Sequence, residues 1–198
     1  MQISSESIQK QIPYYLSQES KDNLVKALDS FPRSIQYYIN KYPADVLQGD
    51  GWNSLEIIRF EDGERGLIKG IILTNSCDID SNNIRVMPPK LSFAPLISLD
   101  VFIGFLEKAG LEVKQISDKI TAIKEQKVSS LFYLPKSKGI DVDSVALLED
   151  VHSIPFTSFN ARHDKQKLFT LSDVGFYLFL MKLSIHFCRF HEDIARSD

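Results

Sequence analysis

Cys77 and Asp78 place a thiol beside a carboxylate directly after an apolar run, and a thiol becomes a nucleophile when a base removes its proton. His152 and His163 are the candidate bases for such a step. A cysteine that closes an apolar strand is usually a small buried hydrophobic residue. We therefore favour a structural role, in which Asp78 accepts backbone N–H bonds in the turn that follows.

The C-terminal stretch holds potential metal ligands at helical spacing. Cys188 would share a helix face with His191 or Glu192, close to His186. A zinc site usually takes a second pair of ligands from elsewhere in the chain, and Cys77 alone is a poor candidate for that pair. We predict no metal ion and no cofactor.

Residues 162–167 form the densest basic cluster of the sequence. Its candidate binding residues are Arg162, His163, Lys165 and Lys167. Loops of this kind contact phosphate groups or an acidic protein partner when they gather on one rim of a fold. A solvated loop is the simpler interpretation, and we favour it.

Composition and motifs exclude several classes of function. The 23 Lys+Arg against 26 Asp+Glu give a net charge of −3, which argues against general binding to nucleic acids. The sequence contains no Gly-rich phosphate loop, no Gly-x-Ser-x-Gly elbow and no His-Glu-x-x-His helix. Nucleotide hydrolysis, serine hydrolysis and zinc proteolysis are therefore not expected.

The length of 198 residues and the hydrophobic share of 43% predict one folded domain, with or without an appendage. Two cysteines suit a reducing compartment. Residues 1–16 lack the basic and apolar regions of a signal peptide, and the apolar run 174–187 is too short for a membrane span. We expect a cytoplasmic protein that does not enter a membrane.

Apolar residues recur at helical spacing in the first part of the chain. In the middle of the chain they form short runs instead. Residues 1–48 are predicted to be a helical segment, in which Ile35, Tyr38, Ile39 and Tyr42 share one face. Three antiparallel strands follow at 55–60, 67–74 and 85–98, with a turn at 61–64. Prolines within the third strand predict that it is bent or peripheral there.

The domain over 49–198 continues with a helical insertion at 99–127, whose first helix Asp100 would cap. Strands return at 130–134 and 145–148, and 152–167 is predicted to be irregular. A helix over 172–193 begins at the N-cap Ser172 and turns Lys182 and His186 away from the core.

The middle of the chain carries an ordered set of short motifs. They are Gly49-Asp50, the turn Gly63-Glu64-Arg65-Gly66, the run from Lys69 to Asn75, and Ala94-Pro95-Leu96-Ile97-Ser98. This order resembles the MazF/PemK (Kid) toxin superfamily over 49–98, and the last thirty residues resemble its C-terminal helix. The resemblance implies an α+β fold built on a small SH3-like antiparallel β-barrel, and it implies a homodimer.

The resemblance also implies the positions of an active site, and at these positions the residues of this chain differ from those of the family. In MazF-like ribonucleases an arginine at the start of the second strand and a hydroxyl at the end of the third act on the RNA. Lys69 stands near the arginine position and Ser98 near the hydroxyl position, while a shifted alignment brings in Arg65. A lysine is a point charge without the planar fork of arginine, so the replacement is not conservative.

A second likeness concerns the string Leu73-Thr74-Asn75-Ser76-Cys77-Asp78-Ile79. It is similar to a strand-end motif of uncharacterised bacterial proteins, some from mobile-element or phage-defence neighbourhoods. Our leading hypothesis is a non-catalytic or degenerate interaction subunit of a bacterial toxin–antitoxin or phage-defence assembly, with a protein partner. Two alternatives are a sequence-specific endoribonuclease that uses Lys69 or Arg65 with Ser98, and a nucleic-acid-binding adaptor that uses the basic cluster.

Overall fold

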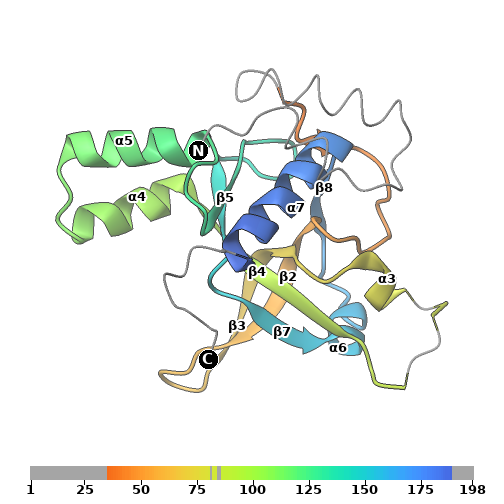
Figure 1. The fold of residues 1–198 in the computed structure, drawn as a ribbon. Coiled ribbons are helices and arrows are strands. Elements are labelled where there is room, and N and C mark those ends of the chain that lie inside the picture. Colours follow the sequence, from red (N-terminus) through yellow and green to blue (C-terminus); the bar gives the residue numbers. More distant parts are fainter. Residues whose placement is uncertain (1–34, 81, 84–85, 189–198) are drawn as a thin grey trace, which may run out of the picture.

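The fold is α+β, as predicted, and is built on an eight-stranded sheet whose pairings are all antiparallel. A computed structural model describes residues 35–80, 82–83 and 86–188 (Figure 1). The elements in chain order are β1 (Tyr38–Ile39), β2 (Gly51–Ile58), β3 (Arg65–Ile72), α3 (Ser76–Ile79), β4 (Lys90–Ser98), α4 (Leu99–Lys108), α5 (Val113–Lys124), β5 (Leu131–Leu134), β6 (Ser144–Leu147), β7 (His152–Pro155), α6 (Phe156–Asn160), β8 (Lys167–Leu171) and α7 (Asp173–Phe187).

Strands β2, β3 and β4 form the predicted meander. Gly51 pairs with Ile71, and Gly70 pairs with Pro95. A Cβ at Gly70 would lie 2.7 Å from the Leu55 side chain and 2.9 Å from the carbonyl oxygen of Ala94, so only glycine lets the three strands approach this closely.

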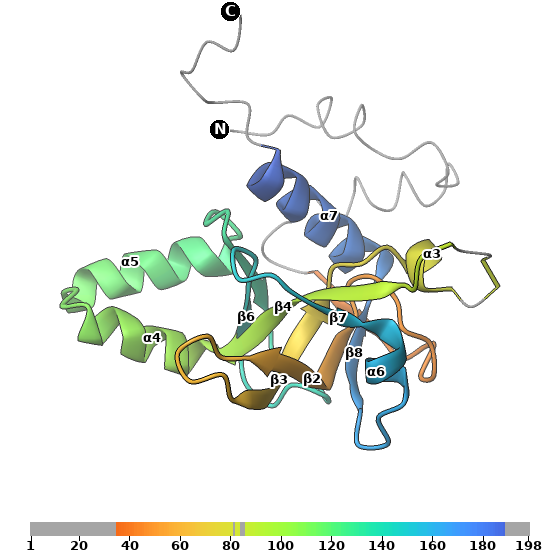
Figure 2. The same cartoon turned by 90° about the horizontal axis from the view of Figure 1, so that it is seen from below.

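Strand β4 changes its second partner halfway along its length. Its first half pairs with β7, from Lys90 to Phe93, and its last three residues pair with β6. Pro95 lies between these two partners, where neither strand needs its missing N–H, which explains how a central strand tolerates proline. Because the sheet divides at this point, it curls into a half-barrel (Figure 2).

Strand β8 builds the other side of the sheet, between β1 and β2. Two predictions are wrong here. The region 152–167 is not irregular, since it contains β7 and α6 and leads into β8. Residues Tyr38 and Ile39 form a strand instead of a helix, because they pair with Leu171 and Thr170 far along the sequence. The remaining predicted N-terminal helices lie outside the described residues.

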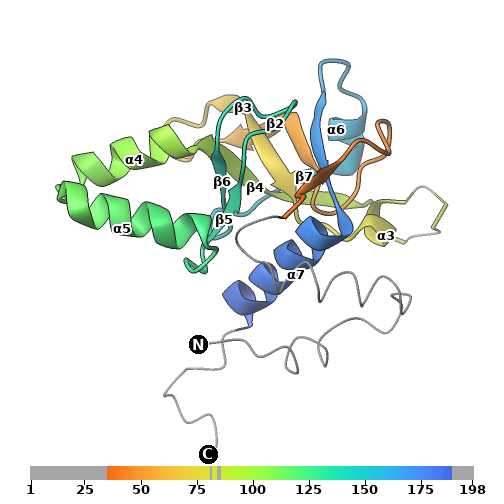
Figure 3. The same ribbon diagram turned by 90° about the horizontal axis from the view of Figure 1, so that it is seen from above.

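Helices α4 and α5 form a hairpin that projects from the sheet (Figure 3), and both were predicted. The N-cap of α4 is Ser98 rather than Asp100: its hydroxyl accepts the N–H of Val101 at 3.2 Å. In α5, Glu112 and Gln115 form a reciprocal capping box. The base of the hairpin packs on β5 and β6 through Leu99, Ile123, Leu131 and Val145.

Helix α7 covers one face of the sheet with Leu178 and Phe179 (Figure 1), while Trp52, Leu55 and Phe159 fill a second core. Its N-cap is Ser172, as predicted, and residues 189–193 of the predicted helix lie outside the described residues. The prediction for Lys182 is wrong. Its side chain is buried and its ammonium donates to the carbonyl of Gln126. Within the described residues, no helix combines the length and apolar character that crossing a membrane requires.

The buried Lys182 makes stability depend on pH in a specific direction. Burial lowers the pKa of its ammonium group to about 8. An unfolded lysine keeps its proton to higher pH, so above pH 8 the unfolded chain binds more protons and stability rises with pH. Relative to Lys182→Met, the unaltered protein should gain about 1 kcal/mol of unfolding free energy between pH 7 and 9 in urea titrations.

The exposed Lys119 supplies the control for this measurement, because Lys119→Met should keep the pH dependence of the unaltered protein. Identical pH profiles for the unaltered protein and Lys182→Met would show that burial does not shift this lysine.

Candidate functional site

A cavity of about 490 Å³ opens where the half-barrel fails to close. One wall of the cavity is the end of β2, residues 56–58, and the opposite wall is β7. Helix α6 lines the cavity between these two walls. We call this cavity the open seam. Its volume lies within the range of ligand pockets, about 300–1,000 Å³.

The seam is open because β8 leaves β2 early. The two strands pair only at Gly51 and Trp52, after which the 162–166 loop follows β2 as far as Asn53 and Ser54. On the opposite wall, β7 pairs with β4 alone among the described strands. Both walls of the seam are therefore strand edges, which carry unpaired backbone groups.

Ladder alternation shows which backbone groups face the seam. The N–H of Arg59 bonds to the carbonyl of Glu64 at 2.9 Å, which fixes the phase of the β2–β3 ladder. In this phase Glu56 and Ile58 turn their N–H and C=O groups away from β3. The bond from the Phe156 N–H to the Pro89 carbonyl likewise turns Ser153 away from β4.

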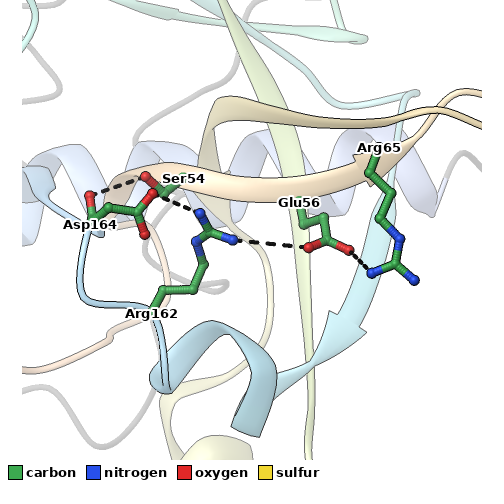
Figure 4. Close-up of polar contacts among 5 residues, drawn as sticks. All are labelled: Ser54, Glu56, Arg65, Arg162 and Asp164. Carbon is green, nitrogen blue, oxygen red and sulfur yellow. Dashed lines mark hydrogen bonds and ion pairs between the residues drawn. The ribbon is translucent and has the colours of Figure 1, made fainter.

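Four charged side chains alternate in sign along the seam (Figure 4). Arg65 Nη1 lies 3.0 Å from Glu56 Oε1, and Arg162 Nη1 lies 4.0 Å from the other oxygen of that carboxylate. Arg162 Nη2 also lies 2.7 Å from Asp164 Oδ2, and the hydroxyl of Ser54 donates to the backbone of Asp164. The Arg162 guanidinium lowers the pKa of the Asp164 carboxyl.

His152 lines the seam, but its ring is held by its neighbours. The ring stacks on Phe93 at 5.7 Å between centroids, and Nε2 lies 3.0 Å from Asp150 Oδ1. The hydroxyl of Ser153 contacts that of Ser92 at 3.4 Å. Among the described residues, the hydrogen bonds of the serines lining the seam join none of them to His152 or Glu56, so the seam shows no activated serine.

The structure divides the predicted basic cluster. Arg162 belongs to the seam, and His163 is exposed. Lys165 turns back on the carbonyls of Asn160 and Arg162. Lys167 is almost buried, with its Nζ 2.7 Å from Asp50 Oδ2 and over the Trp52 ring. Two of its four residues, Lys165 and Lys167, therefore serve the fold directly.

The three residues of the predicted ribonuclease site have separate surroundings. Lys69 is exposed on β3, Ser98 caps α4, and Arg65 lies in the seam beside Glu56. Their catalytic role stays a prediction.

Cys77 and Asp78 lie in the short helix α3, and both are exposed. The expectation of a buried cysteine at a strand end is wrong, because the Asn75 side chain accepts the Cys77 N–H at 2.9 Å and starts a helix there. In the described ranges, no three side chains are grouped so that they could hold a metal ion. His191 and Glu192 lie outside these ranges.

Sequence reasoning missed Glu56 and Asp50 as partners of the basic residues. Glu56 stands in an apolar run and Asp50 in a turn, and neither position carries a catalytic motif. For Glu56 one signal was available. Ser54 and Glu56 alternate with the apolar Leu55 and Ile57, as on a strand with one polar face.

Replacing Lys167 tests whether this lysine holds the fold together, in contrast to an exposed lysine. Lys167→Met leaves the buried Asp50 carboxylate without its partner and should lower the unfolding free energy by about 3–5 kcal/mol. Adding Asp50→Asn should recover part of this loss, because the amide carries no charge. Lys138→Met, at an exposed position, should change stability by less than about 0.5 kcal/mol. Similar small losses for both lysines in urea titrations would contradict the structural role of Lys167.

Comparisons with known proteins add no relative. No family model matches the sequence, and no curated protein is significantly similar to it.

Proposed function

We propose that this chain is a non-catalytic interaction subunit that docks an extended segment of a partner protein in the open seam. One observation carries the proposal: both walls of the seam are strand edges, and no strand of the described residues lies beside their outward backbone groups at Glu56, Ile58 and Ser153. An extended peptide binds such an edge through its main chain, as an added strand.

The polar groups of the seam support binding over catalysis. The carboxylates of Glu56 and Asp164 are paired with arginines, and the His152 ring is stacked and paired with Asp150. Each carboxylate therefore faces a guanidinium group, and among the described residues no serine of the seam is hydrogen-bonded to His152 as a nucleophile would be to its base.

The setting we propose is a bacterial toxin–antitoxin or phage-defence assembly. Its support is the resemblance of the strand order to MazF/PemK-like barrels, together with the half-barrel curl of the meander. Since one fold hosts many functions, the seam rather than the resemblance defines the experiment.

Filling the seam should abolish docking. Ser158 is exposed in α6 and lines the cavity, so Ser158→Trp places an indole where the segment would lie. Ser184→Trp makes the same change at an exposed site on α7. Tagged proteins purified from the native cells should retain a stoichiometric partner in the unaltered and Ser184→Trp forms and lose it in Ser158→Trp.

A photocrosslinking residue at position 158 locates the contact. It should form a covalent adduct with one continuous segment of the partner, and the same residue at position 184 should not. A partner that is retained by Ser158→Trp and crosslinks only at position 184 would contradict docking in the seam.

The ribonuclease alternative makes the opposite biochemical prediction. Ser98 caps a helix and Arg65 pairs with Glu56, so we expect the purified protein to leave RNA intact. Cleavage of total cellular RNA that is lost in Lys69→Ala or Ser98→Ala would replace our proposal with that alternative.

A further inference from the structure

We propose that the docked segment carries a carboxylate side chain that binds the N–H groups of Arg65 and Arg162 that Glu56 and Asp164 leave unused. This inference rests on the proposed function, and it names the chemistry of the partner. The two guanidinium groups come from β3 and from the loop after α6, and they converge on the seam from opposite sides of Glu56 (Figure 4).

The two arginines have more N–H groups than their partners use. Each guanidinium presents five N–H groups. Arg65 uses one nitrogen, on Glu56, and its side chain remains 73% exposed. Arg162 makes one short contact, with Asp164, and its second contact with Glu56 at 4.0 Å is too long for a hydrogen bond. The unused N–H groups of Arg65 are therefore open to an incoming acceptor, and Arg162, which is 26% exposed, is open to a lesser extent.

Arg162 shows the shortage of acceptors most clearly. Its Nε is buried and has no hydrogen-bond partner among the described residues. A buried donor without an acceptor is costly, and because this Nε is closed to solvent, a ligand would contact Arg162 through its Nη atoms. Carboxylates match the planar fork of arginine and form the stronger, charge-assisted bonds.

Apolar side chains at the mouth of the seam define the neighbours of this carboxylate. Phe60 is 95% exposed, Ile58 is 50% exposed and Val151 is 45% exposed, and all three line the cavity. Residues two apart share one face of a strand. We therefore expect apolar residues two positions before or after the acidic one.

The surrounding charge favours a single carboxylate over a polyphosphate. The turn beside Phe60 carries Glu61, Asp62 and Glu64, and the whole chain has a net charge of −3. A nucleic-acid strand would bring a row of phosphates against these acids, whereas a segment with one acidic residue brings a single negative charge.

A phage-displayed library of random 12-residue peptides, selected on the full chain, tests this inference. Peptides assigned to the seam are those that lose binding to Ser158→Trp and keep it to Ser184→Trp. We expect them to share one Asp or Glu with apolar residues two positions away. Replacing that acid by its amide should weaken binding at least about tenfold. Arg65→Gln and Arg162→Gln should each reduce this difference between acid and amide, and thermal melting checks that both variants fold.

The outcomes separate the two proposals. Seam peptides without an acidic residue, or with equal affinity for acid and amide, would overturn the carboxylate and leave docking in the seam intact. A library that yields no peptide sensitive to Ser158→Trp would overturn both. Binding of a 12-nucleotide RNA that is lost in Ser158→Trp and falls steeply with salt would also overturn both, in favour of a nucleic-acid site.

Discussion

The buried ion pair of Asp50 and Lys167 fixes the arrangement on which the rest of the structure depends. Burial raises the pKa of the Asp50 carboxyl, while Lys167 and the Leu47 N–H favour its charged form. Lys167 also donates to the carbonyl of Tyr42 at 2.6 Å. The pair therefore joins the start of β2, the start of β8 and the segment after β1 at one buried point. Replacing one partner leaves an uncompensated buried charge, so the pair disfavours registers of β8 that would separate Lys167 from Asp50.

The position of this pair also explains the open seam. Because Lys167 holds β8 against the first residues of β2, the chain before it passes over Asn53 and Ser54 and does not pair with 56–58. The loop then places Arg162 beside Glu56, opposite β7. One buried contact thus positions both the unpaired strand edge and the arginine beside it, which are the two features that the proposed docking of an extended segment uses.

Local patterns in the sequence predicted the elements that depend on local contacts. The meander, the α4–α5 hairpin and the N-cap Ser172 were all found at the expected places. Two of the failures involve long-range partners. Tyr38 is in a strand because it pairs with Leu171, and the buried Lys182 donates to the carbonyl of Gln126, 56 residues earlier. For the site, Arg65 and Arg162 were singled out separately, but Glu56, which brings them together, carries no motif of its own.

Amide hydrogen exchange, measured residue by residue on the chain without a partner, tests the open seam most directly. The account predicts alternating protection along β2: slow exchange at Leu55 and Ile57, whose N–H groups face β3, and fast exchange at Glu56 and Ile58, which face the seam. Ser153 should exchange as fast as these two. Equal protection of all four β2 amides would mean that this edge is already paired, and it would contradict an open seam that waits for a partner strand.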